Sequence, residues 1–265
     1  MVKFLALQAL FCSLLFAASA TLSAQALSAD ASAARSLFSD ESKFIDEKGF
    51  VKTKEIVGLL QENGLFDAAS FSSSSLNLKF TTSDEISPAI FVKALNFSLD
   101  MMGTNIARVN EFSNLSPISY SLIALKSGGI DPVLLAQALN TSGFGILEFS
   151  RQSGNLVISL EAKDAQIKSG EPIFGEEFVL PRSAGAYFLN TSGASELEIV
   201  SNEPSRWVPL VRIYDKNLEQ IVSFEEHKAM HKYDLQLPSD AKYVLISDNI
   251  DINNIKNDIS VKLSK

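Results

Sequence analysis

The pattern of hydrophobic residues divides the chain into two parts. The first part mixes the periods of strands and helices, and the second shows the strand period alone. Between residues 76 and 160, short runs with apolar residues at every second position alternate with longer runs in which apolar residues recur every three or four positions. The first period predicts half-buried strands and the second predicts amphipathic helices. The predicted strands are 76–80, 106–109, 118–125, 146–149 and 156–160, and the predicted helices are 87–102 and 131–140.

The order of these elements predicts a fold class. Strand, helix, two strands, helix and strand follow one another, which is the split arrangement (βαββαβ) of ferredoxin-like α/β sandwiches, here with one extra strand. Both helices begin with a proline, at Ser87-Pro88 and Asp131-Pro132, where the missing N–H of proline costs no helical hydrogen bond. We therefore expect an α+β protein with a ferredoxin-like α/β sandwich domain at residues 70–165.

After residue 166 only the strand period remains. Turn residues separate the strand patterns at fairly regular intervals, which is typical of antiparallel β-sandwiches. We therefore expect a C-terminal antiparallel β-sandwich domain at residues 166–265. Its predicted strands are 178–180, 186–189, 197–200, 210–214, 233–237, 243–246 and 259–263.

The N-terminal residues 1–20 have the pattern of a secretory signal peptide. Lys3 precedes an almost unbroken apolar run, and Ala18-Ser19-Ala20 supplies a small-x-small cleavage site, although a second such triplet at 24–26 leaves the cleavage position open. The apolar run is shorter than the roughly 20 residues that span a bilayer. No later stretch is apolar enough to span one, so we expect export and no integral membrane segment after signal cleavage.

Two further segments precede the first predicted domain. Residues 21–36 are rich in alanine and serine, and we expect them to form a flexible leader. Residues 37–69 are expected to form a helical preface. Its helix is predicted to have Thr53 as the N-cap and to stop at Asn63-Gly64.

Composition narrows the compartment and the partners. The only cysteine, Cys12, lies inside the predicted signal peptide, so the mature chain would carry no disulfide, thiol nucleophile or thiolate metal site. Secreted animal proteins usually carry disulfides, so the bacterial periplasm is the expected location. The chain has 23 basic and 31 acidic residues. This negative charge disfavours binding to nucleic acid and to anionic membrane surfaces.

Candidate metal ligands are few, and the sequence predicts no catalytic residue and no cofactor. His227 and His231 lie four positions apart, and on a helix their imidazoles could share a metal ion. Lys228 stands where a metalloprotease helix has glutamate, and the surrounding pattern indicates a loop, so solvated histidines are the main interpretation. The oxygen-rich segment Asp248–Asp258 leaves a calcium site open, although Asn and Asp equally favour tight turns.

Aromatic residues leave a glycan-binding or peptidoglycan-binding module open. Trp207 and four of the five tyrosines, among them Tyr214, lie in the second half of the chain. Exposed aromatic rings offer flat apolar platforms to sugars. Most of these residues alternate with aliphatic neighbours, which favours core packing, and Trp207 is the one expected to be exposed. Trp207 and Tyr214 are therefore the candidate ligand-binding residues.

Several segments carry a resemblance to a known family. Residues 207–217, 237–238 and 243–248 resemble a conserved periplasmic protein family of epsilonproteobacteria, and the runs at 58–66 and 130–135 fit the same family. This family has no assigned activity, so the resemblance implies a periplasmic location and no catalytic residue. The same C-terminal strands are similar, more weakly, to the pre-peptidase β-sandwich modules of secreted enzymes.

Together these patterns predict a non-enzymatic periplasmic protein that acts through contacts with envelope proteins. Two alternatives from other classes stay open. One is a carbohydrate-binding or peptidoglycan-binding module that uses Trp207 and nearby tyrosines. The other is a metal-binding protein that uses the loop with His227 and His231.

Overall fold

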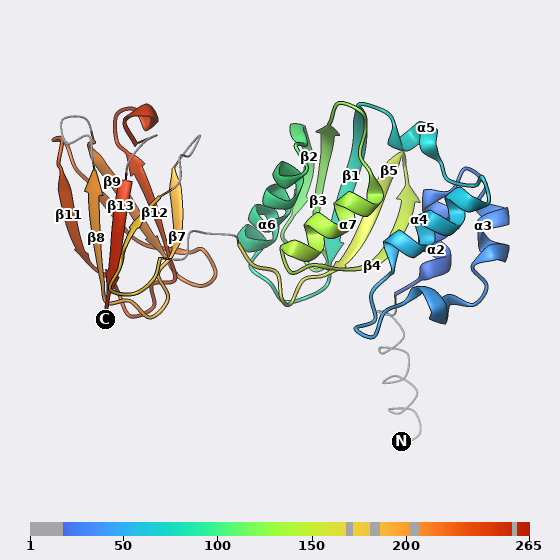
Figure 1. The fold of residues 1–265 in the computed structure, drawn as a ribbon, viewed down its shortest axis with the longest axis horizontal. Coiled ribbons are helices and arrows are strands. Elements are labelled where there is room, and N and C mark those ends of the chain that lie inside the picture. The colour runs from blue at the N-terminus through green and yellow to red at the C-terminus, as the bar shows by residue number, and fades with distance from the viewer. Residues whose placement is uncertain (1–17, 168–171, 181–185, 202–206, 256–258) are drawn as a thin grey trace, which may run out of the picture. The chain divides into compact units, whose positions relative to one another are not determined.

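Two structural units follow one another along the chain, Met1–Ile167 and Lys168–Lys265 (Figure 1). The boundary expected from the sequence, after residue 165, lies two residues before this division. The structure is a computed structural model, and it shows a mixed α+β protein that is rich in β-sheet. In the part of the chain that the structure describes, no helix is long and apolar enough to cross a membrane. The structure describes residues 18–167, 172–180, 186–201, 207–255 and 259–265.

The first unit contains a five-stranded sheet with the strand order β2-β3-β1-β5-β4. Neighbouring strands are antiparallel except for β1 and β5, which are parallel. Five strands are one more than the βαββαβ order contains. The last of them along the chain, β5, lies inside the sheet between β1 and β4. The strands are β1 (Ser75–Thr82), β2 (Asn105–Ser113), β3 (Ile118–Leu125), β4 (Gly145–Gln152) and β5 (Asn155–Glu161).

Two helices, α6 (Pro88–Met101) and α7 (Pro132–Thr141), lie on the face of the sheet that Figure 1 turns toward the viewer. Both begin at the prolines that the sequence pointed to. The carboxylate of Asp131 accepts the N–H groups of the first turn of α7, so it caps that helix. Apolar residues of both helices and of alternate positions on β1, such as Leu78 and Phe80, are fully buried in one core.

The segment expected to be a flexible leader is instead folded. Ala20, Ala24 and Leu27 are fully buried, and their spacing places them on one side of a helix that packs on β4. An alanine-rich and serine-rich composition suggested flexibility, but small side chains also let a helix lie close to a strand. The elements before β1 are α2 (Ala20–Leu27), α3 (Ala31–Leu37), η1 (Glu41–Phe44), α4 (Thr53–Glu62) and α5 (Ala68–Phe71).

The predicted helix of the preface is present as α4, but Thr53 does not cap it. Lys52 occupies the N-cap position, and Thr53 is the first helical residue. The Thr53 hydroxyl is buried without a hydrogen-bond partner among the described residues. The helix ends at Asn63, as the sequence predicted.

The second unit contains two four-stranded antiparallel sheets, with the strand orders β10-β9-β12-β7 and β11-β8-β13-β6. The sequence missed β10, because Ile221 and Val222 are adjacent and a bulge interrupts the alternation there. The elements are β6 (Glu177–Val179), β7 (Tyr187–Asn190), β8 (Glu196–Ser201), β9 (Pro209–Tyr214), β10 (Gln220–Glu225), β11 (Lys232–Gln236), β12 (Tyr243–Asp248), η2 (Ile252–Ile255) and β13 (Ile259–Ser264).

The core of the second unit is formed by both of its sheets. Alternate residues of the central strands are buried in one apolar cluster, which is the pattern of strands with one inward face. The members from the four central strands are Leu197, Ile199, Val211, Ile213, Val244, Ile246, Ile259, Val261 and Leu263.

Candidate functional site

The edge of the first sheet at β4 is covered by the N-terminal helix α2. The backbone N–H of Ser19 donates a hydrogen bond to the carbonyl of Leu147 at 3.1 Å. The backbone N–H of Phe149 donates to the hydroxyl of Ser23 at 3.0 Å, and this serine is fully buried. These bonds use polar backbone groups on the outer side of β4. This edge is therefore closed to a further strand.

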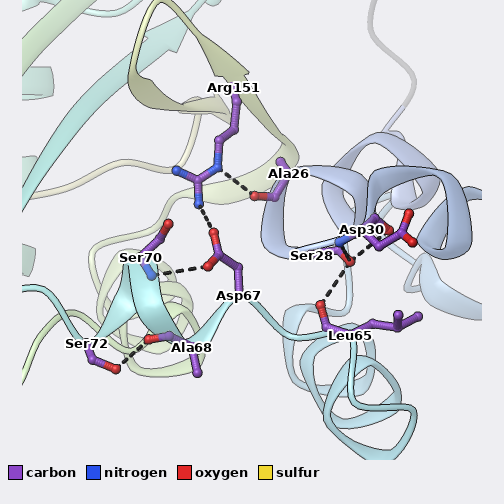
Figure 2. Close-up of polar contacts among 9 residues, drawn as sticks. All are labelled: Ala26, Ser28, Asp30, Leu65, Asp67, Ala68, Ser70, Ser72 and Arg151. Carbon is purple, nitrogen blue, oxygen red and sulfur yellow. Dashed lines mark hydrogen bonds and ion pairs between the residues drawn. The ribbon is translucent and has the colours of Figure 1, made fainter.

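Arg151, on β4, strengthens this cover (Figure 2). Its Nε donates to the carbonyl of Ala26 in α2 at 3.0 Å, and its Nη2 lies 3.2 Å from Oδ2 of Asp67. The other carboxylate oxygen of Asp67 accepts the N–H of Ser70 and so caps α5. The guanidinium also lies 5.6 Å from the centre of the Phe71 ring. One side chain thus joins β4 to two helices, which indicates a structural role.

The opposite edge of the sheet, at β2, has no such cover among the described residues. No strand follows β2 in the sheet order, and no described group makes a hydrogen bond to its outer backbone. Seven of its nine residues are exposed and the other two are half-buried. A strand of this length with unpaired N–H and C=O groups is a template on which another strand can pair.

Strand β2 contains two bulges, and its apolar residues recur at every third position. Its residues Ile106, Val109 and Phe112 each pair with a buried residue on the same face of β3. The bulges therefore keep all three side chains on the face of the sheet that the helices cover. Val109 and Phe112 are nevertheless each 47% exposed, because they lie at its rim, and Leu115 just beyond the strand is 73% exposed.

The other face of β2 carries two charges, Arg108 and Glu111. Their partners in the register, Ile123 and Ser121, are two positions apart on β3, so both charges lie on the same face. Lys79 Nζ lies 3.3 Å from Oε2 of Glu111. The guanidinium of Arg108 donates to the side chain of Asn110 within the strand and makes no ion pair with any described residue.

A groove of about 980 Å³ with a mixed polar and apolar lining lies elsewhere in the first unit, among β1, β4, β5 and the loop at Lys48. Glu148, in its lining, is half-buried, and this burial raises the pKa of its carboxyl, with a smaller contribution from the charge of Glu41. Two other carboxylates of the lining, Asp84 and Glu161, each lie within 4.0 Å of Lys163 Nζ. Asp84 accepts the N–H of Ala162 at 2.7 Å. The hydroxyl of Thr82, also in the lining, donates to Oδ2 of Asp84 at 3.5 Å and accepts the N–H of Asp84 at 3.2 Å, so these contacts hold the turn after β1.

Comparisons with known proteins leave the function to be argued from these contacts. No protein-family model matches the chain. A comparison with curated proteins finds no match either. The resemblance to an epsilonproteobacterial periplasmic family therefore stays a prediction.

The expectation that Trp207 is exposed is wrong. Its side chain is fully buried, and its indole N–H donates to the carbonyl of Ser247 at 3.0 Å. The ring also meets Tyr233 edge to face. A tryptophan packs readily into a core when a strand carbonyl accepts its N–H. Trp207 therefore offers no platform to a sugar.

Tyr214, the other candidate for ligand binding, lies at the end of β9 and is half-buried. Its ring contacts Phe188, which also stacks on Tyr243. These rings lie on the face of the sheet opposite the core residues of β9 and β12. Tyr214 is therefore separated from Trp207 by the sheet, and the two candidates do not form one site.

His227 and His231 lie in the loop between β10 and β11, so the helical spacing that would bring two imidazoles together does not apply. Nδ1 of His231 lies 2.6 Å from the carbonyl of Ser201 and carries the proton of that hydrogen bond. The described residues contain no group of three His, Asp or Glu side chains that could hold a metal ion.

In the segment Asp248–Asp258, which the sequence left open as a calcium site, the carboxylate of Asp248 binds backbone N–H groups. Asp248 is buried, and its two oxygens accept the backbone N–H groups of Val208, Ile250 and Asp251, each at 2.8 Å. These bonds are those of a tight turn that also holds the start of β9. Asp258 lies outside the described residues.

Proposed function

We propose that this protein is a non-enzymatic interaction protein of the bacterial periplasm that binds an extended protein segment along β2. The observation that carries the proposal is the contrast between the two sheet edges. Backbone groups of β4 are bonded to α2, whereas β2 has no cover among the described residues. An exposed edge strand can take up a strand from a partner, and main-chain hydrogen bonds then join the two.

The side chains of β2 supply the selectivity of this binding. In strand addition, main-chain hydrogen bonds give affinity and alternate side chains give specificity. Val109 and Phe112 offer apolar contacts at the rim of one face, and Arg108 and Glu111 offer charges on the other. A partner strand that carries apolar residues opposite the first pair and charges opposite the second fits this edge.

The location and the finer fold classes belong to the same proposal. We propose that residues 1–20 direct export to the periplasm, in line with the resemblance to an epsilonproteobacterial envelope family. Cleavage after Ala20 would remove the Ser19–Leu147 bond at the β4 edge and leave the Ser23–Phe149 bond in place. We also propose that the first unit is a ferredoxin-like α/β sandwich into which β5 has been inserted, and that the second unit is a β-sandwich. The split β-α-β connections and the core shared by both sheets of the second unit support these assignments.

Photo-crosslinking from β2 in intact envelopes tests the proposed function. A photoreactive amino acid at Phe112 is expected to capture a protein, because its side chain lies beside the unpaired edge. The matched control is Leu134 on α7, which is 48% exposed and lies away from this edge. Crosslinks at Phe112 that are absent at Leu134 support the proposal. Equal capture at both positions, or capture at neither, contradicts it.

A further inference from the structure

We infer that the partner of β2 is β2 of a second copy of this chain, so that two five-stranded sheets join into one sheet across a two-fold axis. The inference rests on the proposed function, because it names the occupant of the same edge. Antiparallel pairing of identical edge strands is the symmetric form of strand addition. In such a pair, if residue i lies opposite residue j, then j also lies opposite i.

The two charges of β2 are complementary to themselves in this arrangement. Arg108 and Glu111 lie on the same face of the sheet. A two-fold register that places Arg108 opposite Glu111 of the second copy also places Glu111 opposite Arg108 of the second copy. Opposite charges that face each other across antiparallel strands are stabilising, and like charges are destabilising. The register therefore creates two favourable pairs at once.

Both charges are available for this pairing. Arg108 makes no ion pair with any residue that the structure describes, and its Nε donates to the neutral side chain of Asn110 at 2.9 Å. Glu111 contacts Lys79 through Oε2 only, and its side chain stays 59% exposed. A carboxylate accepts several donors, so Glu111 can bind Lys79 and an arginine of the second copy together.

The same register suits the apolar residues. It brings Phe112 of each copy beside β2 of the other copy. Phe112 is 47% exposed in the single chain, and the second strand would remove part of that surface from water. Burial of apolar surface adds a driving force that does not depend on the charges.

Charge reversal combined with light scattering tests the inference. The purified full chain is expected to be a dimer. Arg108→Glu and Glu111→Arg should each weaken dimerisation about tenfold or more, because each puts like charges opposite one another twice. An equimolar mixture of these two variants should form a heterodimer, because unlike charges then face each other at both positions. The double variant should dimerise more strongly than either single variant, because unlike charges again face each other across the two strands.

Controls with the same charge changes come from exposed sites on other elements. Arg35→Glu on α3 and Glu62→Arg on α4 should leave the dimer intact. Recovery in the mixture shows that the single variants are folded. A wild-type chain that stays monomeric up to high concentration overturns the inference, as does a dimer that none of the β2 variants weakens.

The crosslinking experiment distinguishes a wrong partner, which overturns only the dimer, from a wrong docking edge, which overturns the proposed function. A monomeric chain that still captures another envelope protein from Phe112 overturns the second copy as the partner but keeps β2 as the docking edge. A monomeric chain that captures nothing contradicts both. A dimer whose crosslinks at Phe112 join two copies of the chain supports both.

Discussion

At the scale of single residues, the hydrogen-bonding side chains described above hold parts of the chain together. Asp248 binds three backbone N–H groups, and Arg151 joins β4 to α2 and α5. Such contacts cannot be recognised from composition, because an aspartate-rich turn and a calcium loop use the same residue types. The exposure of Trp207 was mispredicted for a similar reason. Its neighbours in sequence are polar or turn-forming, but its surroundings in space are the core.

The first prediction at this scale concerns Asp248. Asp248→Ala leaves the N–H groups of Val208, Ile250 and Asp251 without their acceptor, and it should lower the free energy of unfolding by about 3 kcal/mol. Chemical denaturation followed by tryptophan fluorescence measures this, because Trp207 is the only tryptophan and reports on the second unit. Asp240→Ala, at an exposed turn position, is the control. Equal midpoints for both variants would show that the turn does not depend on the carboxylate.

The second prediction concerns Tyr233. Burial of its ring, together with the Glu226 carboxylate that accepts its hydroxyl at 2.9 Å, raises the pKa of Tyr233 to about 12. An unfolded chain ionises tyrosine near about pH 10. The folded state thus binds more protons between these values, so this contribution to stability is full below about pH 10 and is lost as the pH rises toward 12.

A difference titration of phenolate absorbance between wild type and Tyr233→Phe isolates this residue. Glu226→Gln should lower the Tyr233 pKa, because it removes a negative charge that opposes ionisation. Glu225→Gln, at the exposed neighbouring position, should leave it in place. A Tyr233 pKa that is the same in wild type and Glu226→Gln would contradict the assigned role of Glu226.

At the scale of elements, the strands and helices with clean periods were predicted well and those with interrupted periods were not. The expected range of β3 agrees with the structure, whereas β2 was expected to stop at Val109. Its apolar period of three, which the two bulges produce, belongs to neither a regular strand nor a regular helix. The two bulges place three apolar residues of β2 on one face, and they also explain why the full length of β2 could not be predicted from the sequence. Strand β2 is exposed because it lies at the edge of the sheet, and the order of strands in a sheet cannot be read from the local sequence.

A prediction at this scale tests the cover of the opposite edge. Ser23→Ala removes the hydroxyl that accepts the buried N–H of Phe149, and it should destabilise the first unit by about 1 to 3 kcal/mol. Hydrogen exchange at the Phe149 amide and thermal unfolding followed by circular dichroism measure the effect. Ser32→Ala, an exposed serine on α3, is the control. Unchanged protection of the Phe149 amide would mean that α2 does not seal β4.

At the scale of the whole molecule, the sequence predicted an α+β chain with a change of pattern near residue 166, and the structure divides after Ile167. Hydrophobic periods report such large divisions because each unit buries its own apolar faces. The role of residues 21–36 could not be predicted in this way. Their alanines and serines become a packed helix only because β4, far away in sequence, lies against them.

The position of α2 also determines how large an assembly can become. A sheet with two bare edges can add copies at both edges, and such edge-to-edge growth has no natural end. Because α2 covers β4, β2 is the open edge of the first unit's sheet among the described residues, and pairing through β2 occupies that edge. Loss of α2, by truncation or by proteolysis within residues 20–27, would therefore change the product from a closed pair to an open-ended fibre.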